Sequence, residues 1–78
     1  MAMSETNWLG MFADNLKDIL KDHKMSQREL ADASGLSESV VSDYLRKKKM
    51  PGVRAIVNMA IALGIDVDEL VNFDEIIY

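Results

Sequence analysis

The sequence predicts an all-α domain built from five short helices. Aromatic residues make up only 6% of the chain and β-branched residues are sparse, whereas Ala, Leu, Met, Lys, Asp and Glu are abundant. This composition favours helices over strands. Apolar residues also recur at spacings of three and four, and Gly or Pro stands between these stretches, as expected where helices end. A length of 78 residues suits one domain, which we expect to span residues 1–78.

The first helix is expected to begin between Ser4 and Asn7 and to end near His23. The residues that recur on one side of it are Trp8, Met11, Phe12, Leu16, Ile19 and Leu20. Charged residues fall largely on the other side. The apolar side is therefore expected to pack in the core, and nothing marks His23 as a ligand or a base.

A helix-turn-helix motif is expected over residues 26–46. Ser26 and Glu29 have the spacing of a capping box, in which each side chain accepts a hydrogen bond from the other residue's backbone N–H. The helix that follows meets Gly35, a residue suited to the left-handed conformation that ends helices. Ser37 is placed to cap a second helix that reaches the end of the motif. Two short helices joined by a short turn with glycine in it define this motif.

Two further helices are expected after the motif. Pro51 marks the break, because proline is tolerated at a helix start but not inside one. The apolar residues of the next helix are Val53, Ile56, Val57, Met59, Ala60 and Leu63. Gly64 ends that helix, and Asp66 is placed to cap a short last helix that ends at about residue 71 or 72.

The charges are unevenly distributed along the chain. A net charge of −4 disfavours a nucleic-acid partner at first sight. Residues 46–54, however, contain five basic side chains and no acidic one, whereas residues 55–78 contain five acidic side chains and no basic one. The basic residues of the run are Arg46, Lys47, Lys48, Lys49 and Arg54. Taken alone, such a run is as consistent with a solvated loop as with a phosphate-binding site.

Secreted and membrane proteins do not fit the sequence. The chain has no cysteine, so it has neither a disulfide framework nor a thiolate metal site. Its N-terminus lacks the pattern of a secretory signal, and no stretch approaches the roughly 18 apolar residues of a membrane span. We therefore expect a cytoplasmic protein with no membrane partner.

Enzymes and metal-binding proteins are disfavoured as well. The carboxylates fall on solvent-facing positions without a nucleophile–base pair or a metal-ligand spacing. Asp66-Val67-Asp68 resembles the start of a calcium loop, but the later glycine and glutamate of such a loop are absent. We expect no catalytic residue, metal, cofactor or small-molecule ligand.

The run SQRELADASGLSESVVSDYLRKKKMPGVRAIVNMAIALGIDVDEL resembles the Cro and lambda-repressor-type helix-turn-helix family, also called XRE-like, over about 45 of the 78 residues. Ala31, Gly35 and Val41 occupy the family's small, glycine and β-branched positions. Physically, Ala31 lets two helices cross closely, Gly35 takes the turn conformation and Val41 is buried. The resemblance implies a five-helix lambda-repressor-like DNA-binding domain.

The resemblance also implies which residues contact double-stranded DNA. The second helix of the motif lies in the major groove in this family, which assigns base reading to Ser37, Glu38, Ser39, Ser42 and Asp43. Phosphate contacts come from the start of the first motif helix and from the loop after the second. They are thereby assigned to Ser26, Gln27, Arg46, Lys47, Lys48, Lys49 and Arg54. Val40 either contacts a thymine methyl group or completes the core.

The chain departs from the family pattern at two places. Where the family commonly has Glu followed shortly by Gly, this chain has Leu45-Arg46-Lys47, so the second helix could extend further. The reading face also contains Glu38 and Asp43, which repel phosphates. The sequence therefore predicts a small DNA-binding repressor of phage or mobile-element type, with a protein-interaction module on the same scaffold as the alternative.

A homodimer is expected, because the family usually binds DNA as a twofold dimer. The apolar residues after the last family match are Val71, Phe73, Ile76, Ile77 and Tyr78. This tail, residues 71–78, either forms the dimer contact, which we favour, or folds back to cover the core.

Overall fold

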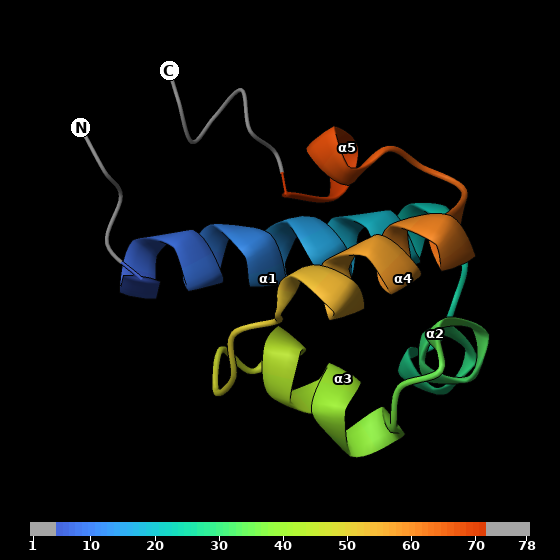
Figure 1. The fold of residues 1–78 in the computed structure, drawn as a ribbon, viewed down its shortest axis with the longest axis horizontal. Coiled ribbons are helices and arrows are strands. Elements are labelled where there is room, and N and C mark those ends of the chain that lie inside the picture. The colour runs from blue at the N-terminus through green and yellow to red at the C-terminus, as the bar shows by residue number, and fades with distance from the viewer. Residues whose placement is uncertain (1–4, 72–78) are drawn as a thin grey trace.

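The computed structural model describes residues 5–71, which contain five α-helices and no strand (Figure 1). The helices are α1 (Glu5–Asp22), α2 (Gln27–Ser34), α3 (Glu38–Leu45), α4 (Val53–Leu63) and α5 (Val67–Val71). The all-α prediction is confirmed, and so are the number and the order of the expected helices.

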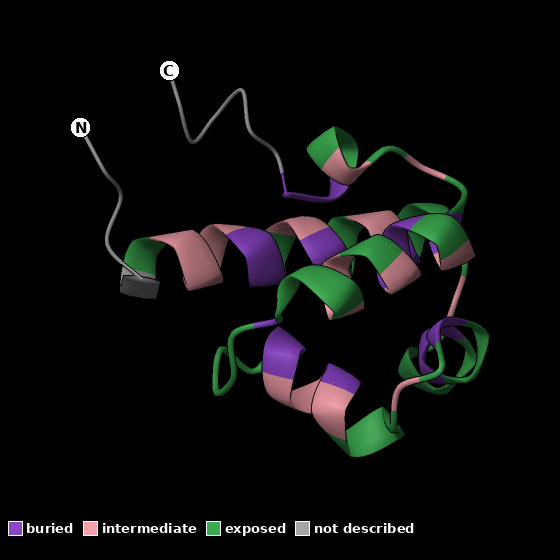
Figure 2. Ribbon diagram, in the orientation of Figure 1, coloured by how far each residue is buried: buried purple, intermediate pink, exposed green. Residues whose placement is uncertain are grey.

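The helices form two groups around one core. In Figure 1, α4 crosses in front of α1, α5 lies above them, and α2 and α3 lie below. Accordingly, α5 packs on α1 and α4, whereas α2 packs on α4 and α3 packs on α1 and α2. Figure 2 shows the buried residues on the inward sides of the helices. The largest fully buried side chains are Phe12, Leu16, Leu30, Val41, Met59 and Leu70.

The apolar side of α1 packs as expected, but that of α4 does so only in part. Phe12, Leu16 and Leu20 are buried, and the rest of the α1 stripe is half-buried. On α4, by contrast, Val53 is 79% exposed and Val57 is 38% exposed. These two valines satisfy the helical periodicity but lie on a side of α4 that no other described helix covers.

Helices α1 to α4 all end in a Schellman motif, in which a left-handed residue lets the next N–H bond back to a carbonyl five residues earlier. The left-handed residues are Lys24 (φ 53°), Gly35 (φ 72°), Lys47 (φ 63°) and Gly64 (φ 67°). The hydrogen bonds run from Met25 N to Leu20 O (2.9 Å), Leu36 N to Ala31 O (3.0 Å), Lys48 N to Asp43 O (2.8 Å) and Ile65 N to Ala60 O (3.1 Å). Glycine was expected at two of these ends. Lysine at the other two was not, and α3 ends at Leu45 without a glycine.

The residue after the left-handed position distinguishes the end of α3 from the other three. Met25, Leu36 and Ile65 are half-buried and pack against the core, the apolar contact that commonly accompanies this motif. At the end of α3 the equivalent residue is Lys48, which is exposed. That turn therefore gains no core contact from its last residue and presents a cation to solvent.

Two polar side chains of α1 bind the ends of other helices. The Asn15 side-chain amide donates to the carbonyl oxygens of Glu69 (2.8 Å) and Leu70 (2.7 Å) in α5. The His23 ring nitrogens lie 2.9 Å from the Ile19 carbonyl oxygen and 3.1 Å from that of Leu63. His23 thus joins the C-terminal ends of α1 and α4.

Aromatic contacts join α1 to α3. Trp8 and Phe12 stack with ring centroids 5.3 Å apart, and Phe12 meets Tyr44 edge-on at 6.4 Å. Such contacts stabilise a fold by about 0.5–1.5 kcal/mol beyond the area they bury. Burial of Tyr44 also raises the pKa of its phenol above the usual value of 10.0.

Glycine at either lysine-occupied helix end should stabilise the protein. The left-handed conformation costs an L-residue about 1–2 kcal/mol, and the larger chain entropy that glycine loses on folding offsets part of the gain. We expect Lys24→Gly and Lys47→Gly each to raise the free energy of unfolding in urea by about 0.5–1 kcal/mol. Lys48→Gly is the matched control, and an equal gain there would contradict this account.

Removal of the Asn15 amide should loosen α5. We expect Asn15→Ala to lower the free energy of unfolding by about 1–2 kcal/mol, because two carbonyl oxygens at the end of α5 lose their donor. Hydrogen exchange should show the amides of α5 exchanging faster, with little change in α2. The control is Asp18→Ala at an exposed position of the same helix. Equal effects of the two substitutions would show that the amide contributes nothing specific.

Stability should decrease at alkaline pH because of Tyr44. Its pKa is higher in the folded than in the unfolded chain, so the stabilisation is complete below about pH 10 and is lost as the pH rises through the folded-state value. We expect urea midpoints at about pH 8 and pH 10.5 to differ less for Tyr44→Phe than for the wild type. Lysines titrate equally in both proteins. Parallel declines would therefore exclude Tyr44 as the cause.

Candidate nucleic-acid interface

The helix-turn-helix frame is built from α2, α3 and the three residues between them. Ala31 is 1% exposed and Val41 is fully buried, so both inner faces lie in the core. Gly35 takes the left-handed conformation at the end of α2. The buried Ser34 hydroxyl donates to the Leu30 carbonyl oxygen at 2.6 Å, so the core side of this helix end has its polar group satisfied. This packing holds the outer face of α3 away from the core.

The start of α2 is capped as its sequence predicts. The Ser26 hydroxyl accepts from the Glu29 backbone N–H at 3.0 Å, and the Glu29 carboxylate accepts from the Ser26 backbone N–H at 3.1 Å. By helix geometry, the N–H groups of Gln27 and Arg28 have no carbonyl partner within α2. Both residues are exposed at the positive end of the helix, where an anion such as phosphate is bound most readily.

The outer face of α3 is rich in serine and contains two acidic residues. Ser37, Glu38 and Ser39 are exposed, whereas Ser42 and Asp43 are half-buried. The five assigned base-reading residues therefore lie on one helix and its cap, with unequal access to a ligand.

Two details restrict what this face can do. The Ser37 hydroxyl accepts from the Val40 backbone N–H at 3.2 Å and lies 3.2 Å from the Ser39 hydroxyl, so the cap already occupies it. Val40 is half-buried and packs against the core. That packing favours the core role for Val40 over the thymine contact.

The basic loop, residues 46–49, follows directly from α3. All four of its side chains are exposed, and the turn formed by Lys47 and Lys48 fixes its path. The Lys47 ammonium lies 3.5 Å from the Asp14 carboxylate of α1, with both side chains about half exposed or more. A pair this exposed is weak and is screened by salt, so Lys47 is readily available to another anion. Pro51 is buried and ends the loop.

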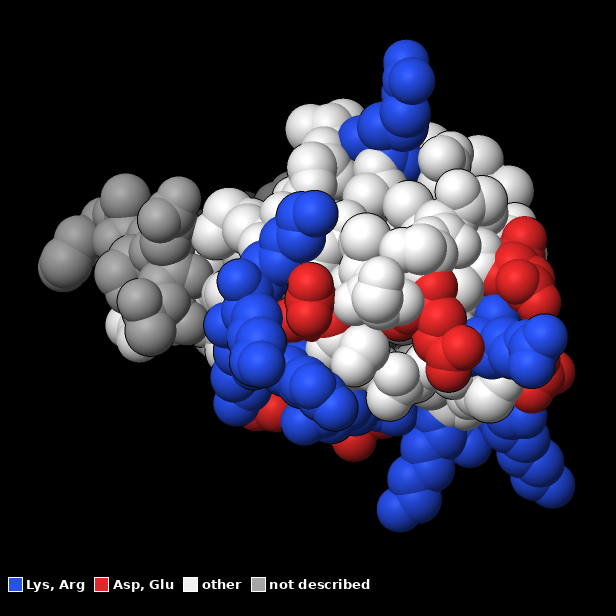
Figure 3. Space-filling view, turned by 90° about the horizontal axis from the view of Figure 1, so that it is seen from below, with Lys and Arg blue, Asp and Glu red and all other residues white. Residues whose placement is uncertain are grey.

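The charges around α3 form a basic rim and a more acidic centre. Figure 3 shows the face that carries α3, with Lys and Arg side chains gathered toward its left edge and acidic side chains nearer the middle. Arg28 and Arg54 are exposed too. Arg28 was absent from the residues assigned from sequence, although its place in the first turn of α2 could have suggested it. This face can bind a polyanion along its rim while offering hydroxyl and carboxylate groups at its centre.

Only one residue of the expected dimer tail lies within the described residues. Val71 is 3% exposed, so it is part of the core and presents no surface to a second copy. Phe73, Ile76, Ile77 and Tyr78 lie outside residues 5–71.

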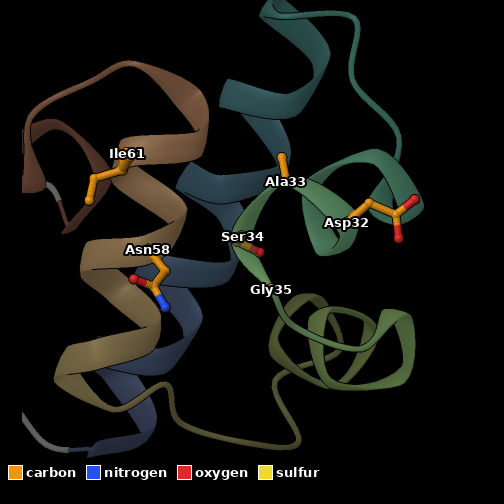
Figure 4. A pocket seen from close by; sticks show the side chains of 6 residues that line it. All are labelled: Asp32, Ala33, Ser34, Gly35, Asn58 and Ile61. Atoms are coloured by element: carbon orange, nitrogen blue, oxygen red, sulfur yellow. The ribbon is translucent and has the colours of Figure 1, made fainter.

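Outside the interface, the described residues offer little for other chemistry. Between the end of α2 and α4 lies an open hollow of about 410 Å³, shown in Figure 4. Its lining residues are Asp32, Ala33, Ser34, Gly35, Asn58 and Ile61. Within residues 5–71 there is no cluster of three His, Cys, Asp or Glu side chains that could hold a metal ion. No helix in that range has the length and apolar character needed to cross a membrane.

Known proteins share this arrangement. An uncharacterised HTH-type transcriptional regulator of Bacillus subtilis, YqaE, is 28% identical over 62 residues, which are 80% of this chain and 53% of that protein. The chain thus spans about half the length of this relative.

Two solved structures are similar in fold and in sequence. The restriction-modification controller protein C.AhdI from Aeromonas hydrophila has a TM-score of 0.77 and 32% identity over 80% of this chain and 94% of that one. The hypothetical transcription factor NHTF from Neisseria has a TM-score of 0.79 and 30% identity over 91% of this chain and 82% of that one. The family HTH_3, described as helix-turn-helix, matches residues 16–70. With a match over most of its length, the chain belongs to the helix-turn-helix family.

Proposed function

We propose that this protein is a transcription regulator that binds double-stranded DNA with α3 in the major groove. The observation that carries the proposal is the basic loop, whose four exposed cations follow directly from the only helix of the motif that presents a polar outer face. The capped start of α2 supplies a second anion site beside it. Proteins similar to this chain include a restriction-modification controller and an HTH-type transcriptional regulator, which supports a regulatory role.

Phosphate contacts would supply most of the affinity. We assign them to the N-terminus of α2, with Ser26 and Gln27, and to the basic loop. We add Arg28 on the strength of its exposed position. Each neutralised phosphate lowers log K by about 0.9 per log unit of salt, so binding would be strongly salt-dependent. Such a regulator would act in the cytoplasm and need no catalytic residue.

Base reading would depend on hydroxyl and carboxylate groups. Glu38, at the exposed N-terminal end of α3, is placed to accept from a cytosine amino group. Ser39 and Ser42 donate or accept at several bases and so discriminate weakly. Because Glu38 and Asp43 repel phosphates, a sequence that offers no donor to them would be disfavoured. Specificity would thus come partly from rejection of the wrong sequence.

One observation favours a second candidate function, a protein-interaction module on the same scaffold. Glu38 and Asp43 place negative charge in the middle of the face that would enter the groove. A basic segment of a partner protein would meet this centre more favourably than a DNA duplex would. In that case the basic loop would be a solvated turn and would bind no phosphate.

A fluorescence anisotropy titration with random-sequence duplex at low and moderate salt distinguishes the two functions. We expect salt-sensitive binding by the wild type. For the triple variant Lys47→Glu, Lys48→Glu, Lys49→Glu, we expect affinity to fall more than about tenfold and the salt slope to decrease by about 3.

The matched control is Lys17→Glu, Lys21→Glu, Lys24→Glu, which makes the same change in net charge on α1 and the turn after it. We expect it to keep the wild-type salt slope and most of the affinity. Absence of wild-type binding at low salt, or equal losses in the two triple variants, would contradict DNA binding through the basic loop.

A further inference from the structure

The outer side of α4 carries an apolar stripe that nothing in the described structure covers. Val53 is 79% exposed, Val57 38% and Ile61 72%. With Met50, just before α4, they are the only large apolar side chains of residues 5–71 classed as exposed. Residues four apart lie on one side of a helix, so the three α4 residues form one continuous surface. Apolar surface gathered in this way marks an interaction site.

The two ends of this stripe carry opposite charges. Arg54 follows Val53 at the N-terminal end and is exposed. At the C-terminal end, Ile61 stands on one rim of the hollow between α4 and α2, and Asp32 stands on the other (Figure 4). Asp32 is the one charged residue among those that line the hollow. The α4 surface is therefore apolar along its length, with a base at one end and an acid beside the other.

We propose that this α4 surface is the contact between two copies of the protein, packed antiparallel about a twofold axis that passes beside Val57. A twofold contact must be self-complementary, and the stripe satisfies this condition. Val53 and Ile61 lie equally far along the chain from Val57, so each valine meets the partner's isoleucine. Arg54 then extends over the partner's hollow toward its Asp32. A single surface thus supplies both the apolar contact and its two ion pairs.

The arrangement suits the binding of one duplex by both copies. In Figure 1, α4 runs across the molecule and α3 lies below it. A twofold axis perpendicular to α4 and directed toward the α3 side reverses the partner's α4 while keeping both α3 helices on the same side. Two such helices read half-sites about 34 Å apart. This step rests on the proposed function, whereas the dimer contact does not. It also assigns Arg54 to the dimer contact instead of to phosphate.

Sedimentation equilibrium of the full chain tests the contact. We expect a dimer for the wild type at tens of micromolar. Ile61→Asp and Val57→Asp should weaken dimerisation by more than about tenfold, because each buries a carboxylate against the partner. Both positions are exposed enough to accept a polar group in a folded monomer, which circular dichroism verifies. Lys17→Asp on α1 is the surface control, and we expect it to remain dimeric.

Charge reversal supplies a readout that a general surface effect would not produce. Arg54→Glu and Asp32→Arg should each weaken the dimer, and the two substitutions together should restore it. A monomeric wild type would overturn the proposal. So would dimers that survive Ile61→Asp but dissociate in the double variant Ile76→Asp, Ile77→Asp, since the tail would then be the contact.

The outcomes separate this proposal from the proposed function. A dimer that Ile61→Asp dissociates, in a protein that binds no duplex, would support the α4 contact and reject DNA binding. Salt-sensitive duplex binding together with a dimer that the α4 substitutions leave intact would do the reverse.

Discussion

The left-handed residue that ends each of the first four helices is the constraint on which the rest of the structure depends. It satisfies carbonyl groups that a helix end would otherwise leave without partners, and it turns the chain within a few residues. Short turns leave each helix little freedom to choose its neighbours. The angle between α2 and α3, and hence the outward display of α3, follows from the turn at Gly35. The position of the basic loop follows in the same way from the turn at Lys47.

Local signals were enough to predict the helices. The Ser26–Glu29 capping box and the glycines at two helix ends appear in the structure as expected, because each acts through its own backbone and immediate neighbours. Lys24 and Lys47 show where such reasoning stops. Lysine has no preference for the left-handed conformation, so the end of α3 could not be read from residue type. Packing of the surrounding helices imposes that turn against local preference.

Exposure was harder to predict than helicity, for both the core and the candidate site. Periodicity shows that Val53 and Val57 lie on one helix, but only the positions of the other helices decide whether that side is covered. The basic run was visible in the sequence, whereas its continuity with α3 depends on the helix ending at Leu45. Val40 was equally compatible with groove and core until its neighbours were known. The acidic centre of the reading face, by contrast, follows directly from Glu38 and Asp43.

The two hydrogen bonds from Asn15 to α5 have a consequence for the order in which the domain is assembled. They connect residues 54 and 55 positions apart, so the donor leaves the ribosome long before its acceptors do. During synthesis the α1 surface that later contacts α5 has no intramolecular cover, and this exposed intermediate is the form most open to chaperones or aggregation. Completion of α5 closes the domain, which makes the last helix a checkpoint that couples release of the chain to native structure.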